Sequence, residues 1–169
     1  MIFENELISG TLIKRYKRFF VDIKVKNKVI TAHCPNTGSM MGLLKKGNKV
    51  WLTKSNDIKR KLKYTLQIIE VNGSKIGVNT HLTNKIFYES LLNGNIINLK
   101  KTDILFREKQ FNKNTRFDFF IKQKNKGIFI EVKNVTLSRF KNIAEFPDAV
   151  TERGLKHINE LLTAKKKGF

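Results

Sequence analysis

The stretch of sequence that decides the fold of the second half runs from Arg116 to Lys133 and reads RFDFFIKQKNKGIFIEVK. It contains two apolar runs, residues 116–121 and 128–133, on either side of a polar segment with a glycine. Runs of this length, rich in Phe, Ile and Val and separated by a short polar turn, predict two antiparallel strands joined as a hairpin.

Asp118, Glu131 and Lys133 are charged residues within these apolar runs. Side chains alternate between the two faces of a strand, so Glu131 and Lys133 are expected on the same face. A hairpin centred between Lys124 and Asn125 places Asp118 opposite Glu131, with Cβ atoms about 4.5–5.5 Å apart. Two facing carboxylates repel each other unless a cation, a proton or a basic side chain lies between them.

A divalent metal is the economical explanation of this pair. Mg²⁺ or Mn²⁺ held by Asp118 and Glu131, with Glu89 and Glu108 as candidate further ligands, suits phosphodiester hydrolysis. Lys133 would then orient the attacking water or neutralise the developing anion. The candidate catalytic residues are therefore Asp118, Glu131 and Lys133. The alternative is a solvated strand face with one ion pair.

The elements around the hairpin define the second half of the chain. Residues 82–92 carry apolar side chains at helical spacing and end at Asn93-Gly94, which predicts an amphipathic helix. A further strand is expected over residues 104–108, and a second helix over residues 151–165. The predicted order is α-β-β-β-α.

The first half reads as β structure. Six short strands with polar turns are expected over residues 10–16, 19–25, 29–33, 49–53, 64–71 and 75–79. This pattern favours a small barrel such as an OB-fold. The fold class is therefore α+β, with an OB-like barrel over residues 1–81 and a second domain over residues 82–169.

Composition narrows the class of protein. No run of about 18 apolar residues is present, which excludes a transmembrane helix, and the N-terminus shows no signal peptide. The single cysteine, Cys34, excludes an internal disulfide and a thiolate zinc site. We therefore expect a cytoplasmic protein that does not associate with membranes.

The charge favours a nucleic-acid partner, with one competing explanation. The chain has 34 Lys+Arg against 14 Asp+Glu, a formal net charge of +20. However, 27 of these cations are Lys and only 7 are Arg, a bias that codon drift in a genome rich in A and T also produces. The Arg residues carry more weight, because drift erodes them and because Arg makes bidentate contacts with phosphates.

The candidate DNA-binding residues are basic side chains near aromatic residues or in loops. They are Arg15, Lys17, Arg18, Lys59, Arg60, Lys61 and Arg116. Tyr16 and Phe19 lie between the first three, in an arrangement suited to phosphate contact and base stacking. The alternative for the first group places Tyr16 and Phe19 in the core and leaves the basic side chains solvated. The alternative for residues 59–61 is a solvated loop.

Four further residues have plainer interpretations. His33 and Cys34 are adjacent and point to opposite faces of a strand, so a structural turn is favoured over a nucleophile or metal site. His157 and Glu160 lie on the second predicted helix, where a surface role is expected.

Wider similarity supports the nucleic-acid interpretation. The Asp118, Glu131-x-Lys133 pattern in this element order resembles the PD-(D/E)xK nuclease-like superfamily. The chain also resembles the bacterial sugar fermentation stimulation protein family in five segments: LIKRYKRF (12–19), HCPNTGSM (33–40), RFDF (116–119), EVKNVTL (131–137) and FPDAVTERG (146–154). The resemblance implies an OB-like barrel joined to a PD-(D/E)xK nuclease-like domain, binding to double-stranded DNA, and a regulatory role in sugar (maltose) utilisation. The site that it implies is Asp118, Glu131 and Lys133.

The chain departs from the family pattern at its end. Family members continue past the second helix into a further apolar strand, so we expect a nuclease-like domain that lacks its last strand and a helix 151–165 that is incompletely packed. Either an eroded gene product or a truncated form accounts for this. The functional hypotheses are a DNA-binding protein, a metal-dependent endonuclease, or a degraded relative with neither activity.

Overall fold

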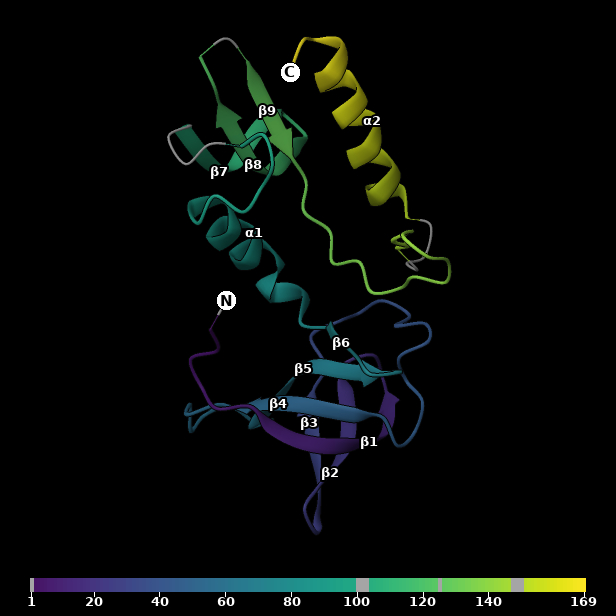
Figure 1. Ribbon diagram of the computed structural model, residues 1–169. Helices are drawn as coiled ribbons and strands as arrows, with labels where there is room; N and C mark the ends of the chain where they lie inside the picture. Colours follow the sequence, from purple (N-terminus) through teal and green to yellow (C-terminus); the bar gives the residue numbers. More distant parts are fainter. Residues whose placement is uncertain (1, 100–103, 125, 147–150) are drawn as a thin grey trace. The chain divides into compact units, whose positions relative to one another are not determined.

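The structure is a computed structural model that describes residues 2–99, 104–124, 126–146 and 151–169. Contacts divide the chain into two compact units (Figure 1). The first unit consists of Met1–Leu82 and Asn134–Ala149, and the second of Thr83–Lys133 and Val150–Phe169. Neither helix of the described residues combines the length and hydrophobicity needed to cross a bilayer.

The first unit contains six strands, as its sequence predicts. They are β1 (Ile8–Tyr16), β2 (Phe20–Val25), β3 (Lys28–His33), β4 (Lys49–Lys54), β5 (Tyr64–Val71) and β6 (Ser74–Gly77), followed by a 3₁₀ turn, η1 (Thr80–Leu82).

Five of these strands close into a barrel. β1 pairs antiparallel with β2 and β4, β2 with β3, and β4 with β5. A parallel pairing of β3 with β5, at His33 and Thr65, completes the circuit, and β6 extends β5 as a hairpin. The predicted OB-like barrel is therefore confirmed.

The barrel core is aliphatic and closely packed. Alternate residues of β2 and β4 point inward, and Val21, Ile23, Val50 and Leu52 have no exposed surface. β1 crosses β2 so closely at Gly10 that a Cβ atom there would lie 2.6 Å from Ile23 Cγ2. Glycine at this position permits the close approach of the two strands.

The second unit follows the predicted order of helix, three strands and helix. Its elements are α1 (Thr83–Leu92), β7 (Ile104–Asn112), β8 (Thr115–Lys122), β9 (Gly127–Ile130) and α2 (Glu152–Lys166). The strands form one antiparallel sheet in the order β7-β8-β9. β7 is four residues longer than the predicted strand.

The hairpin register is the predicted one. Phe119 pairs with Ile130 and Phe120 with Phe129, so the next residues outward, Asp118 and Glu131, lie at the same level. Asn125, at the predicted centre of the turn, lies outside the described residues. The register is fixed because a slip of one residue would turn the apolar side chains of both strands to the opposite face.

β9 ends earlier than predicted. The sequence predicts a strand through Lys133, but the regular strand stops at Ile130. The carboxylate of Asp118 accepts the backbone N–H of Val132, at 2.7 Å from Oδ2. A side chain of β8 thus takes a backbone donor that a continuing strand would pair with another backbone group.

The core of the second unit is aromatic. Phe117 and Phe119 of β8 are at most 2% exposed. The Phe117 ring centroid lies 5.7 Å from that of Phe111 and 5.3 Å from that of Phe129. Phe87 of α1 packs on Phe119 at 4.7 Å between ring centroids.

α2 begins at a side-chain cap and keeps one apolar stripe exposed. The Thr151 hydroxyl accepts the N–H of Gly154 at 3.0 Å. Both residues belong to the segment 146–154 that resembles the family, of which residues 147–150 lie outside the described residues. Leu155, Ile158 and Leu162 are each more than half exposed. The expectation of an incompletely packed helix is therefore confirmed for the described residues.

Candidate functional site

Asp118 is the central residue of the candidate site. It is half-buried on β8, and both of its carboxylate oxygens accept hydrogen bonds. Oδ2 accepts the Val132 N–H, and Oδ1 accepts the side-chain amide of Asn84 on α1 at 2.9 Å. These two donors, one from a helix and one from the end of β9, fix the orientation of the carboxylate.

Glu131 is held by two basic side chains. Its side chain is 9% exposed, and its Oε1 lies 2.5 Å from Lys133 Nζ and 2.7 Å from His157 Nδ1 of α2. Both contacts fall on Oε1. Lys133 remains 48% exposed on its side chain, so it neutralises Glu131 while its ammonium stays accessible to a bound molecule.

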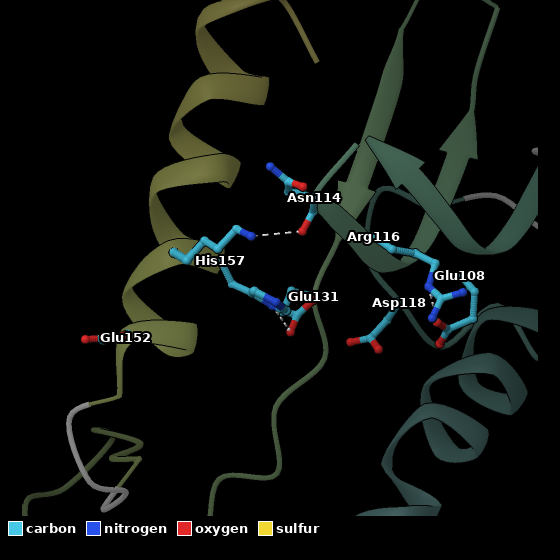
Figure 2. A pocket seen from close by; sticks show the side chains of 8 residues that line it. Glu108, Asn114, Arg116, Asp118, Glu131, Glu152 and His157 are labelled. Carbon is cyan, nitrogen blue, oxygen red and sulfur yellow. Dashed lines mark hydrogen bonds and ion pairs between the residues drawn. The ribbon is translucent and has the colours of Figure 1, made fainter. Parts of the chain in front are cut away.

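Asp118, Glu131 and His157 line a cavity of about 560 Å³. Figure 2 shows the Asp118 carboxylate between Glu131 on one side and Glu108 with Arg116 on the other. Lys156 of α2 also lines the cavity. A volume of this size suits a small ligand or one phosphate group with its neighbours.

Glu108 lies opposite Asp118 and is paired with a cation. Its neighbours Arg107 and Lys109 on β7 pair with Phe119 and Phe117 on β8, the two residues that flank Asp118. Glu108 itself has a φ of +49°. This left-handed conformation is costly for a residue with a Cβ atom. The Glu108 carboxylate lies 3.1 Å from Arg116 Nε, so the predicted DNA-binding residue Arg116 is at the candidate site of the second unit.

A second cavity, of about 530 Å³, adjoins the first. Asp118 and Glu108 line both cavities, and Glu89 lines the second one only. The Arg107 guanidinium lies over the ring of Tyr88, 3.8 Å from its centroid, and forms a flat wall.

The predicted triad is brought together, but a compact metal-ligand cluster is not. Asp118 and Glu131 lie at one level of the hairpin, and Lys133 contacts Glu131. Across the described ranges, no three His, Cys, Asp or Glu side chains are grouped as metal ligands, and Glu89 and Glu108 therefore do not complete such a set with the other two. Two carboxylates still fit Mg²⁺, which is often bound by one or two carboxylates with water as the remaining ligands.

Two residues of this site, His157 and Asn84, were not predicted as site residues. The expected surface role of His157 is wrong, since its ring contacts Glu131. Glu160 lies outside the site and accepts the amide of Asn112 at 2.8 Å. The signal in the sequence was the spacing of His157, Leu161 and Ala164, which places the histidine on the packed stripe of α2. No pattern in the sequence identified Asn84.

The basic strip of the barrel lies on the turn between β1 and β2. Lys17 and Arg18 have positive φ angles of 47° and 61°, and both are exposed. Arg15 holds this turn: its Nε donates to the Arg18 carbonyl at 3.1 Å and its Nη2 to the Asn36 carbonyl at 2.7 Å. Arg15 is thus a supporting residue, and Lys17 and Arg18 are the accessible cations.

The aromatic residues of this turn are at the surface. Tyr16 is 36% exposed and Phe19 is 46% exposed, so the alternative that buries them in the core is wrong. The Tyr16 ring stacks on Phe20, with centroids 5.5 Å apart and planes 14° apart, and Lys14 lies over it.

The second basic segment is a loop, as predicted. Lys59 and Lys61 are exposed, whereas Arg60 is half-buried and donates to the Thr65 hydroxyl at 2.7 Å. Cys34 is fully buried, with its sulfur 3.5 Å from that of Met40, which confirms the structural interpretation of this residue.

The fold and site together define an α+β protein in which an OB-like barrel precedes a domain of strands and helices bearing a carboxylate site. Residues 81–169 match the family model described as sugar fermentation stimulation protein RE domain, and residues 13–78 match the SfsA N-terminal OB domain. The chain belongs to the sugar fermentation stimulation protein family.

Individual relatives agree with this assignment. The chain is 54% identical over its full length to a sugar fermentation stimulation protein homolog of Pelagibacter ubique (strain HTCC1062), and it covers 73% of that protein. It is 44% identical over 95% of its length to the homolog of Sinorhizobium medicae (strain WSM419), of which it covers 68%. A solved structure described as Pyrococcus furiosus SfsA in complex with Ca²⁺ matches 99% of this chain and 71% of its own, with a TM-score of 0.83 and 25% identity.

Proposed function

We propose that this protein binds double-stranded DNA through the β1–β2 turn of its barrel. The observation that carries the proposal is the turn itself, in which Lys17 and Arg18 are exposed next to the exposed Phe19 and are held in place by Arg15. A turn that is already ordered loses little conformational entropy on binding. We propose this binding as the physical basis of the regulatory role in sugar (maltose) utilisation that the family resemblance implies.

Salt dependence is the primary test. Neutralisation of about six phosphates gives a log–log slope of affinity against salt concentration near −5 for duplex DNA. Fluorescence anisotropy with a labelled duplex at several salt concentrations measures this slope. Absent binding, or an affinity that is indifferent to salt, would overturn the proposal.

A matched pair of variants locates the surface. The double variant Lys17→Gln/Arg18→Gln removes two cations from the β1–β2 turn, and we expect it to weaken binding and reduce the magnitude of the slope by about 2. Lys26→Gln/Lys28→Gln removes two exposed cations from the next turn of the same barrel. Equal losses for the two variants would mean that net charge, and not this turn, controls affinity.

We propose metal-dependent phosphodiester hydrolysis as the second candidate function, carried by the geometry around Asp118. Asp118 and Glu131 would hold Mg²⁺ or Mn²⁺, and the Pyrococcus furiosus relative, described as a Ca²⁺ complex, supports a hard cation in this fold. Such an ion supplies an activated water and stabilises charge on the phosphate. Asn84 and the Val132 N–H keep the Asp118 carboxylate oriented.

The remaining residues would act on the substrate and its charge. Lys133 would orient the attacking water or neutralise the developing anion, since its ammonium is accessible beside Glu131. Arg116 and Lys156, which line the cavity together with Asp118 and Glu131, would bind phosphate oxygens. His157 positions Glu131 through its contact with Oε1.

A plasmid-nicking assay tests the enzymatic candidate. Wild type with Mg²⁺ or Mn²⁺ is expected to nick, while Asp118→Asn is expected to retain DNA affinity and lose cleavage. Glu70→Gln, which removes a carboxylate from β5 of the barrel, is the control and should still nick. Wild type that cuts with neither metal would overturn this candidate and leave the DNA-binding proposal intact.

A further inference from the structure

Two of the three histidines of the chain and one arginine gather at one end of the barrel. His33 is the last residue of β3, and its ring centroid lies 6.4 Å from that of His81 in η1. The third histidine, His157, is in the other unit. The predicted structural turn after β3 thus carries a histidine pair that its sequence alone did not reveal.

The histidine pair is built by a hydrogen-bond network. The Thr80 hydroxyl donates to the Pro35 carbonyl at 2.6 Å, which joins η1 to the loop that follows His33. The His81 N–H donates to Asn79 Oδ1 at 3.1 Å, and the Asn79 amide in turn donates to Gln67 of β5 at 2.8 Å. These contacts hold the backbone of η1 close to the end of β3.

Arg60 joins the pair from the β4–β5 loop. Its Nη2 donates to the hydroxyl of Thr65, the residue of β5 that pairs with His33. The neighbours of His33 on the two flanking strands are Phe20 and Thr65, and both are uncharged. The charge of Arg60 therefore acts on His33 at a place where the adjacent strands supply no charge.

The electrostatics of this cluster disfavour the protonated form of His33. Burial lowers the pKa of His33 below its usual value, and the charges of Arg60 and His81 lower it further. Within the described residues, no carboxylate is among the groups that set this pKa. An anion placed beside these side chains would offset the effect of the neighbouring positive charges and favour protonation of His33.

We infer that His33, Arg60 and His81 form a phosphate-binding site that takes a backbone phosphate of DNA and takes up protons when it does so. The inference rests on the proposed DNA binding and names a second contact region on the barrel. It assigns Arg60 a different role from Lys59 and Lys61, which are solvated neighbours in the same loop.

The signature of this site is a pH dependence that surface lysines do not produce. Phosphodiesters do not titrate near neutrality, so a change in DNA affinity between pH 6 and 7.5 reports on histidine. Proton uptake on binding makes affinity fall as pH rises, by about three- to tenfold over this interval. Anisotropy with a duplex at constant ionic strength measures the effect.

Variants assign the effect to its residues. His33→Gln/His81→Gln is expected to flatten the pH profile, and Lys59→Gln to keep it. A flat wild-type profile with intact DNA binding would overturn the inference and leave the DNA-binding proposal standing. A profile that disappears with His157→Gln and persists in the His33/His81 variant would also overturn it.

A measurement on the unmodified full chain tests the site without DNA. The ring resonances of His33 and His81 are expected to shift on titration with inorganic phosphate at pH 6, and those of His157 to shift less. Loss of the shifts in Arg60→Gln would support the site. Resonances that do not respond to phosphate would overturn the inference, even if DNA binding is pH-dependent.

Discussion

The two units of this protein differ in how their sheets end. In the barrel, the pairing of β3 with β5 closes the sheet on itself, and the core is filled with aliphatic side chains. In the second unit, three strands form an open sheet with an aromatic core and charged residues along the hairpin. In the closed sheet the exposed basic side chains Lys17 and Arg18 lie on a turn, whereas in the open sheet carboxylates and cations lie together beside the hairpin.

The largest expected effect on stability comes from truncating one buried side chain in the core of each unit. Phe117→Ala removes a fully buried ring and should lower the free energy of unfolding by about 3–5 kcal/mol. Leu52→Ala, at an equally buried barrel position, should cost about 2–5 kcal/mol. Each loss is expected within the unit that contains the substitution, because each unit has its own core.

Hydrogen exchange measured by mass spectrometry distinguishes the two cores. Phe117→Ala should accelerate exchange in β7 and β8 and leave β2 and β3 protected, with the reverse pattern for Leu52→Ala. Uniform acceleration across both units in either variant would contradict the comparison.

A smaller loss of stability is expected when a glycine is replaced by alanine, and its size should differ between the closed sheet and the open one. Gly10→Ala places a Cβ 2.6 Å from Ile23 Cγ2 and 2.8 Å from the Lys24 carbonyl, and a backbone atom in a closed barrel has little room to move. We expect a loss of about 1–3 kcal/mol in urea unfolding.

The matched glycine lies in the open sheet. In Gly127→Ala the new Cβ meets ring atoms of Phe120 and Phe169, at 2.6 and 2.9 Å. Both partners are side-chain rings and neither is a backbone atom, so the expected loss is about 1 kcal/mol or less. A larger loss for Gly127→Ala than for Gly10→Ala would reverse the ranking of the two sheets.

The smallest effect concerns an ion pair in the segment Asn134–Ala149, which follows the hairpin and belongs to the first unit. Hydrogen bonds from Arg139 lower the pKa of Glu145 below its usual value of 4.5. The contribution of this ion pair is therefore present above the ordinary pKa of the carboxyl group and is lost as pH falls through the lowered value. NMR titration of Glu145 should give a midpoint below 4.5 that returns toward 4.5 in Arg139→Gln, and an unchanged midpoint would contradict this.

Much of the fold was predictable because alternation and turn chemistry are local. All six strands of the first unit and the register of the Asp118–Glu131 hairpin followed from the spacing of apolar residues. The end of β9 did not, because it depends on a side chain of the neighbouring strand taking the Val132 N–H. Local patterns do not contain that competition between side chain and backbone.

The candidate site shows the same division. Asp118, Glu131 and Lys133 lie close together in sequence-defined register, so their proximity was predictable. Asn84 and His157 approach them from two helices, and only the tertiary fold brings these residues to the hairpin. The pairing of His33 with His81 likewise depends on a contact between distant segments.

The two hydrogen bonds of Asp118 have a consequence for reading sequences of this family. An aspartate at this position helps to end a strand and to attach a helix, so selection for folding alone would retain it in a protein without enzymatic activity. Lys133 contacts Glu131 and is otherwise exposed, and folding places a weaker constraint on it. Under the hydrolysis proposed above, the loss of Lys133 in a relative is therefore a better sign of lost activity than the retention of Asp118 is a sign of activity.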